Sequence, residues 1–220
     1  LKRLMLEAPG TYHHSLMTAT IAEAAADAIG VNSLLARVGS YYHDIGKLKN
    51  PEYFIENQGS AVNPHDPLTP AMSSLILVSH VKDGAAIAKK HNLDKEIIDA
   101  IEQHHGTTMM HFFYHKALEI NPDANIENFR YPGPKPKTKV SAIVMIADSC
   151  EAAARALEES SAVRIRETVE KIINNKFTDG QFSDCPITLQ DLQTIRDSIA
   201  ASLISIYHAR IEYKNGEKKN

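Results

Sequence analysis

The stretch SYYHDIGKLKNP, residues 40–51, places a histidine and an aspartate next to each other in an otherwise apolar segment. A carboxylate is rarely buried in a protein unless it is paired with a cation or binds a metal ion. Burial of His43 and Asp44 together therefore predicts that polar side chains elsewhere in the chain are their partners.

Five further residues could be those partners, and each lies on or beside an apolar helical stripe. They are His14, His80, the adjacent pair His104 and His105, and Asp148. Asp148 is the one carboxylate inside the apolar run VSAIVMIADSC (140–150), where its burial is costly unless a cation faces it. A lone buried histidine is more often a satisfied core residue, and a histidine pair at a helix end can complement the helix dipole. Structural explanations of this kind are less convincing for seven such residues in one chain.

The donor set predicts a dinuclear metal site. Seven ligands exceed the three or four that one zinc ion normally takes. Imidazole and carboxylate donors without thiolate suit iron, manganese or zinc. With one bridging carboxylate, the seven residues can hold two ions and leave positions for water or substrate. Two adjacent cations generate a hydroxide nucleophile and clamp a phosphoryl group during displacement.

The composition predicts a single compact domain and limits its partners. The chain has 220 residues, 43% of them hydrophobic, which allows a substantial core. A net charge of −3 argues against a DNA or RNA polymer as partner. The two cysteines, Cys150 and Cys185, have no paired spacing, which is typical of a reducing compartment. No apolar run reaches the ~20 residues needed to cross a bilayer, and the chain starts without Met, so we expect a fragment of a longer protein.

The spacing of apolar residues is helical nearly throughout and predicts an all-α bundle. The first helix is expected over 14–29 and ends at Gly30, and a second follows a cap at Asn32 or Ser33. A third begins at Thr69-Pro70 with a break at Gly84, and a fourth runs from Asp94 to Gly106. Three more are expected within 140–210. The segments 50–70 and 129–139 are rich in proline and are expected to be loops.

The motifs resemble a known family. YHHS (12–15), HDIGK (43–47), HHG (104–106) and the pair Ala147-Asp148, together with His80, resemble the HD-domain phosphohydrolase superfamily and its dinuclear branch. FRYPGPKPKTK (129–139) and AIVMIADSCEAAARAL (142–157) look like the cytoplasmic domain of the bacterial seven-transmembrane HD phosphodiesterases of the PgpH type, which hydrolyse cyclic di-AMP. The resemblance covers residues 5–210. It implies a single HD-type domain over 1–220, within a membrane-anchored parent protein and on the cytoplasmic face of the cell membrane.

The resemblance also implies roles for individual residues. Two ions, expected to be iron or manganese, would be bound. One would be held by His14, His43 and Asp148, the other by His80, His104 and His105, and Asp44 would bridge the two. Lys47 would join Asp44 in catalysis by stabilising charge near the phosphates. Arg130 and Tyr131 are expected to contact a phosphate or stack on a base, with a structural tether as the alternative. The remaining histidines are assigned to the surface or to packing: His13, His65, His91, His111, His115 and His208.

The activity implied by the resemblance is hydrolysis of cyclic di-AMP to linear pApA by a metal-bridging hydroxide. The cyclic di-GMP branch carries a Gly-Tyr-Pro motif soon after its histidine pair, whereas this chain has HHGTTMMHFF (104–113), which favours adenine dinucleotides. Three alternatives stay open. They are a nucleotidase or triphosphohydrolase acting on mononucleotides, a sensor domain that binds the dinucleotide without hydrolysing it, and a di-iron oxygenase on the same helices.

Overall fold

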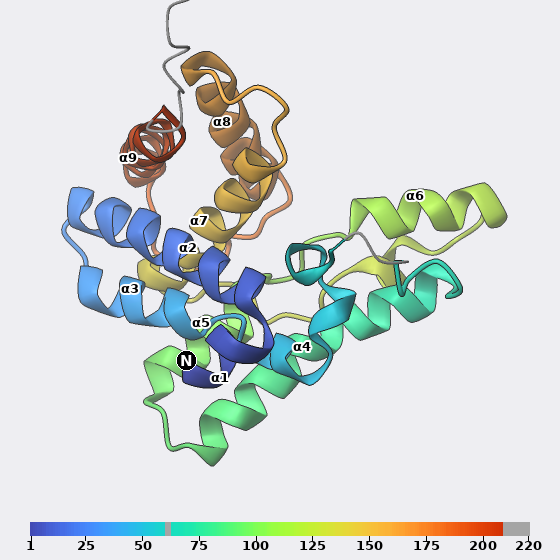
Figure 1. Cartoon of the computed structure of the whole chain (residues 1–220). Helices are drawn as coiled ribbons and strands as arrows, with labels where there is room; N and C mark the ends of the chain where they lie inside the picture. The colour runs from blue at the N-terminus through green and yellow to red at the C-terminus, as the bar shows by residue number, and fades with distance from the viewer. Residues whose placement is uncertain (60–62, 209–220) are drawn as a thin grey trace, which may run out of the picture.

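An all-α bundle is confirmed by the computed structural model, which describes residues 1–59 and 63–208 (Figure 1). Within these residues the elements are α1 (Lys2–Glu7), α2 (Pro9–Ala28), α3 (Ser33–Tyr42), η1 (Ile45–Lys49), η2 (Pro51–Tyr53), η3 (Ile55–Asn57), α4 (Pro70–Lys90), α5 (Lys95–Gln103), α6 (His111–Ile120), η4 (Ile126–Phe129), α7 (Lys139–Arg155), α8 (Ala162–Thr178) and α9 (Leu189–His208), where η marks a 3-10 helix. Residues 60–62 and 209–220 of the predicted 1–220 domain, like the side chain of His208, lie outside the described part.

Predicted helix starts are confirmed where a side chain caps the helix. The side chain of Asn32 accepts a hydrogen bond from the Leu35 amide (2.9 Å), and Thr69 accepts one from Met72 (3.3 Å). Each cap of this kind contributes about 1 kcal/mol to helix stability. Asp94 does occupy the N-cap position of α5, but its side chain makes no capping hydrogen bond.

Several local predictions differ from the structure. Helix α2 begins at Pro9, earlier than expected, because a proline at the first helical position needs no amide partner. The helices α1 and α6 were not predicted. Both lack a side chain that caps the first turn, and α1 has only six residues, too few to show a helical period. The predicted loop over 50–70 contains the two single turns η2 and η3.

The predicted break at Gly84 is wrong, because α4 runs unbroken from Pro70 to Lys90. A Cβ atom on Gly84 would lie 2.9 Å from Ile101 Cγ2 and 3.2 Å from the Gly46 nitrogen. On Gly46 it would lie 1.8 Å from the carbonyl oxygen of His80. The two glycines therefore let α4 and η1 pack backbone against backbone.

Two of the hydrophobic clusters among the described residues are the largest, and α7 belongs to the larger of them. The larger cluster joins α2, α7, α8 and α9, and the smaller one joins η1, α4 and α5. All six residues of 142–147 on α7 are fully buried, so this helix has neighbours on every side. Figure 1 shows α7 between α8 and the α2–α3 pair, with α4 on the other side of α2. None of the described helices has the length and hydropathy needed to cross a membrane.

Candidate metal centre

The seven predicted ligands lie together in two groups that share Asp44. The histidine-rich group contains Asp44, His80, His104 and His105, and the carboxylate-rich group contains His14, His43, Asp44 and Asp148. Within each group, the possible ligand atoms all lie within 4.8 Å of one another. All seven residues are buried except His105, which is partly exposed.

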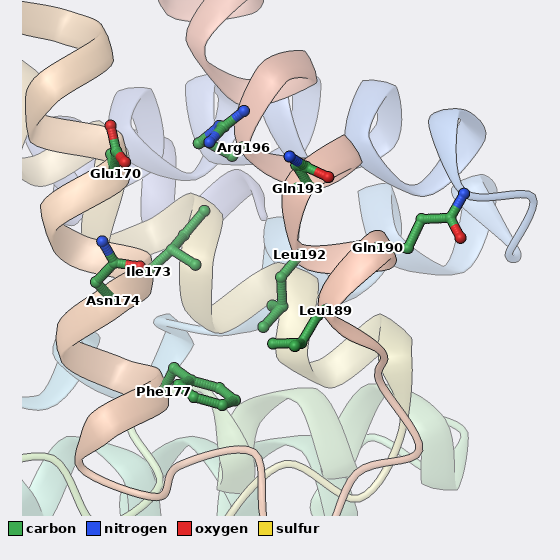
Figure 2. Close-up of a pocket in the computed structure, with 9 residues that line it drawn as sticks. All are labelled: Glu170, Ile173, Asn174, Phe177, Leu189, Gln190, Leu192, Gln193 and Arg196. Atoms are coloured by element: carbon green, nitrogen blue, oxygen red, sulfur yellow. The ribbon is translucent and has the colours of Figure 1, made fainter.

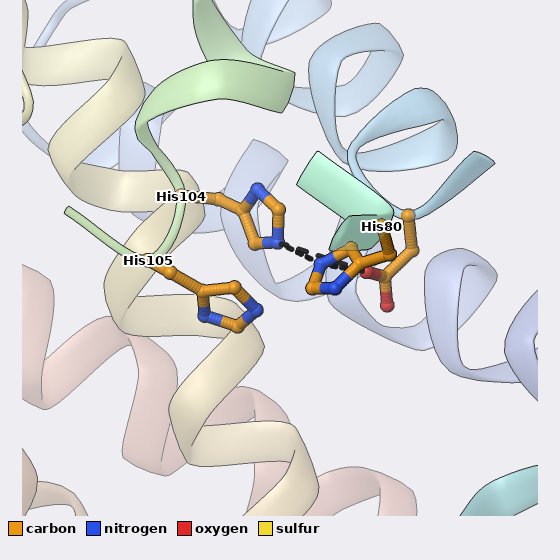
Figure 3. A group of neighbouring side chains, drawn as sticks. His80, His104 and His105 are labelled. Carbon is orange, nitrogen blue, oxygen red and sulfur yellow. Dashed lines mark hydrogen bonds and ion pairs between the residues drawn. The ribbon is translucent and has the colours of Figure 1, made fainter. Parts of the chain in front are cut away.

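Five separate segments bring these side chains together. His14 lies on the buried face of α2, and His43 and Asp44 occupy the turn between α3 and η1. His80 comes from the middle of α4, and Asp148 comes from α7. His104 and His105 follow the last residue of α5, and Figure 3 shows their rings pointing toward His80.

The carboxylate of Asp44 faces both groups, one oxygen to each. Its Oδ1 atom lies 3.3 Å from His80 Nε2 and 3.6 Å from His104 Nε2. Its Oδ2 atom lies 3.2 Å from His43 Nε2 and 3.7 Å from His14 Nε2. This arrangement suits a carboxylate that bridges two cations.

Three of the histidines are oriented by the same local contact, in which Nδ1 donates to the backbone carbonyl oxygen three residues earlier. The pairs are His43 with Ser40 (2.7 Å), His80 with Leu77 (2.5 Å) and His104 with Ile101 (2.7 Å). A carbonyl oxygen can only accept, so Nδ1 carries a proton in all three rings, and Nε2 is the nitrogen that faces the cluster and can bind a metal when it is unprotonated. Metal-binding histidines are commonly held in this way.

His14 is oriented by a carboxylate instead. Its Nδ1 atom is hydrogen-bonded to Glu151 of α7, and its Nε2 atom lies 3.0 Å from Asp148 Oδ1. Sequence analysis missed Glu151, which is only 2% exposed. Asp148 also lies 3.6 Å from His43 Nε2 and, through Oδ2, 3.8 Å from His105 Nδ1.

The residues fit a divalent cation by their unsatisfied polar atoms and by their charge. His43 Nε2 and Asp44 Oδ1 are buried and have no hydrogen-bond partner, although buried polar atoms normally have one. Burial lowers the pKa of His80 to about 3, which keeps its imidazole neutral and able to bind a metal. Burial also opposes the charged form of His43, but Asp44 and Asp148 outweigh it and raise its pKa to about 10. A bound cation would neutralise the carboxylates of Asp44 and Asp148 in place of the protonated His43. We conclude that the cluster can bind metal ions.

Lys47 lies beside the cluster between two carboxylates. Its Nζ atom is 2.7 Å from Asp44 Oδ2 and 2.7 Å from Glu56 Oε1, and Glu56 also accepts a hydrogen bond from Thr11 (2.9 Å). Burial alone would lower the pKa of Lys47, but Asp44 and Glu56 raise it above its usual value. Lys47 is therefore charged, and its charge is already shared by two anions. Sequence analysis missed Glu56.

A cavity of about 530 Å³ opens onto the cluster. Its wall includes His14, His80, His105 and Asp148 from the two groups, the aromatic residues Tyr53, Phe54, Phe112, Phe113 and Tyr131, and the basic residues Lys47, Lys116, Arg155 and Lys176. His65, assigned to the surface or to packing, also lies in this wall. Its Nε2 atom is 2.9 Å from the Tyr53 carbonyl oxygen, and its ring packs against Phe113.

The two predicted substrate contacts in the loop over 129–139 lie in different places. The ring of Tyr131 stacks on His105, with centroids 4.1 Å apart, and lines the cavity. Arg130 does not line it, because its guanidinium donates to Asp179 (2.9 and 3.1 Å) and to the Thr107 carbonyl oxygen (2.8 Å). The structure therefore brings Tyr131, but not Arg130, to the cluster.

A second cavity of similar volume lies elsewhere, so volume alone does not identify the site. Figure 2 shows this cavity of about 600 Å³ between α8 and α9, with Ile173, Phe177 and Leu192 in its wall. None of the seven predicted ligands lines it.

Comparison with known proteins gives consistent matches. A family model described as HD domain matches residues 11–153. The cyclic-di-AMP phosphodiesterase PgpH of Listeria monocytogenes is 54% identical over 97% of this chain, and that of Bacillus subtilis is 50% identical over 100% of it. The chain spans 30% and 31% of the length of these two relatives. A crystal structure of the L. monocytogenes phosphodiesterase PgpH HD domain in complex with cyclic-di-AMP matches with a TM-score of 0.92 and 53% identity, over 94% of this chain and 96% of that one.

Proposed function

The chain belongs to the HD domain family, and we propose that it is a phosphodiesterase that hydrolyses cyclic di-AMP to linear pApA. The observation that carries this proposal is the position of Asp44, whose two oxygens face separate ligand groups, while His14, His80, His105 and Asp148 of those groups line an aromatic-walled cavity. The activity named for the PgpH relatives and the dinucleotide bound in the matching crystal structure support the choice of substrate. Such an enzyme would end a bacterial second-messenger signal.

We propose that the cofactor is a pair of divalent ions, iron or manganese. The first ion would be held by His14, His43 and Asp148, the second by His80, His104 and His105, and both by Asp44. When bound, the pair would supply a hydroxide nucleophile and polarise the phosphodiester. Four of the five histidines, His14, His43, His80 and His104, would present Nε2 in a direction set by the hydrogen bond that already holds Nδ1.

Lys47 and Tyr131 are the proposed contacts around the reacting phosphate. Lys47 keeps Asp44 ionised and in place, and it adds positive charge at the end of the cavity where negative charge develops. Tyr131 presents a ring on which an adenine base can stack, and this ring itself stacks on the imidazole of His105. Arg130 would reach a substrate only after its ion pair with Asp179 is broken. Its proposed contact with the substrate therefore has less support than that of Tyr131.

We also propose that the chain forms one domain over residues 1–220 of a longer, membrane-anchored bacterial protein and faces the cytoplasm. The chain spans about 30% of the length of its PgpH relatives, which supports a longer parent. Both cysteines are free, as is typical of proteins in a reducing compartment.

The test is hydrolysis of cyclic di-AMP by the purified chain after loading with manganese or iron, with metal content measured on the same sample. Cyclic di-GMP and a panel of mononucleotides serve as competing substrates. We expect pApA as the product and about two metal ions per chain. Two ions without dinucleotide hydrolysis would direct attention to the nucleotidase or oxygenase alternative. A chain that binds cyclic di-AMP without ions or hydrolysis would be a sensor domain.

A further inference from the structure

Lys176 of α8 is a buried lysine without a partner. Only 7% of the residue is exposed, and within the described residues its ammonium group makes no hydrogen bond or ion pair. Lysine is almost never buried unless it is paired. Lys47, a second lysine in the wall of the same cavity, is paired twice.

The carboxylates near Lys176 are engaged elsewhere. Asp148 faces His14 and His43 in the carboxylate-rich group. Asp179 is held by the guanidinium of Arg130 and by Gln181. Burial lowers the pKa of Lys176, and the attraction of Asp148 only partly opposes that effect. The positive charge of Lys176 therefore lacks an anion from the protein.

The position of Lys176 shows where such an anion would come from. Lys176 lines the cavity that opens onto the metal-ligand cluster. It shares that cavity with three residues on one face of α7, namely Asp148, Ala152 and Arg155. On this side of the cavity the two cations Arg155 and Lys176 outnumber the one anion Asp148, although the chain as a whole is acidic.

We propose that Lys176 is a substrate-binding residue whose ammonium group donates to a phosphate of the bound nucleotide, next to the metal cluster. This inference rests on the proposed function. A cyclic dinucleotide carries two phosphates, so while one reacts at the cluster the other needs a cation of its own. Lys47 is less suited to this second contact, because Asp44 and Glu56 already share its charge.

The alternative is a lysine that serves only the packing of α8 against α7. Two substitutions separate the roles: Lys176→Met keeps the length of the side chain and removes the charge, and Lys176→Arg keeps the charge. Lys171→Met is the matched control, since Lys171 lies exposed on the same helix. Metal content and thermal unfolding of each variant establish that it is folded and loaded.

The test measures KM and kcat for cyclic di-AMP with the manganese-loaded chain. We expect Lys176→Met to raise KM by about ten- to a hundredfold, with a smaller change in kcat, because a hydrogen bond to a charged group is lost. Lys176→Arg should recover most of that loss, and Lys171→Met should behave as the wild type. A Lys176→Met variant whose KM stays within about twofold of wild type overturns the proposal.

A second measurement keeps this inference separate from the proposed function. Inorganic phosphate should raise the unfolding temperature of the metal-loaded wild type and of Lys171→Met more than that of Lys176→Met, which keeps only the phosphate contact at the metal cluster. Equal stabilisation of all three overturns the role of Lys176, whatever the substrate is. Absence of cyclic di-AMP hydrolysis by the wild type, with the phosphate effect still dependent on Lys176, contradicts the proposed substrate alone.

Discussion

The two ligand groups on either side of Asp44 are built in different ways. In the histidine-rich group, His80 and His104 are oriented by carbonyl oxygens of their own helices, three residues away. In the carboxylate-rich group, His14 is oriented by Glu151, which is 137 residues away in the sequence. His43 in the carboxylate-rich group is also held locally, by the Ser40 carbonyl oxygen. The difference therefore lies in His14, whose orientation requires α2 to be docked on α7.

The groups also differ in charge. The histidine-rich group contains one carboxylate, Asp44, whereas the carboxylate-rich group adds Asp148 and has Glu151 behind His14. Since carboxylate charge strengthens the binding of a cation, we expect the carboxylate-rich group to bind its ion more tightly.

The largest expected effect comes from removing the residue that the groups share. The double substitution His43→Ala and Asp44→Ala should abolish hydrolysis and release both ions, because each group loses at least one ligand. Turnover and metal content check this, with the exposed His91→Ala as control. Near-wild-type activity of the double variant would rule out the metal hypothesis.

The next largest effect is expected when one ligand is removed from a single group. His80→Ala should leave the carboxylate-rich ion in place, so that metal content falls from about two ions per chain to one. His14→Ala should lower metal content in the other group. In both variants we expect turnover to fall by about a hundredfold or more, since loss of an outer-shell partner alone costs 10–100-fold. If both variants lose both ions, the two groups are not independent.

A smaller effect is expected from neutralising the carboxylate behind His14. Glu151→Gln can still accept the hydrogen bond from Nδ1 but loses the negative charge, so affinity for one ion should fall by about 10–100-fold. Competition with a chelator measures this loss, which should appear in only one of the two binding phases. Glu167→Gln, on the exposed surface of α8, is the control. Equal weakening of both phases would contradict the division into two groups.

The smallest effect on metal binding is expected from Glu56→Gln. Lys47 would keep its contact with Asp44 and lose its second carboxylate, so the free energy of unfolding should fall by about 1.5–3 kcal/mol. Because Lys47 contacts the shared aspartate, both ions should be affected alike and only weakly. Chemical denaturation and chelator competition test the two statements, and a loss confined to one ion would refute the second.

Much of the fold and of the cluster could be predicted because the signals are local. Asn32 and Thr69 cap their helices through the amide three residues later, and a local contact of this kind is visible in the sequence. His80 and Asp148 stand out as polar residues in apolar helices, although their metal-binding role stays a prediction. Local signals also mislead, since Gly84 resembles a helix break until its contact with Gly46 is known.

The parts that could not be predicted depend on contacts between distant segments. Glu151 and Lys176 have the sequence context of ordinary charged residues on amphipathic helices, and only the packing of α2 and α8 against α7 buries them. Arg130 lies in a basic loop that suggested phosphate contact, but its partner Asp179 is 49 residues away. The sequence therefore identified the candidate ligands and missed the residues that hold or complement them.

The contact between Gly46 and Gly84 has a consequence for protein engineering. Because the backbone of η1 touches that of α4, the distance from Asp44 to His80 is set by main-chain atoms and not by side-chain packing. Repacking the surrounding core with larger or smaller residues would therefore leave this spacing nearly unchanged. To transfer the site to another scaffold, a designer would have to graft the paired glycines and both backbone segments together with the ligands.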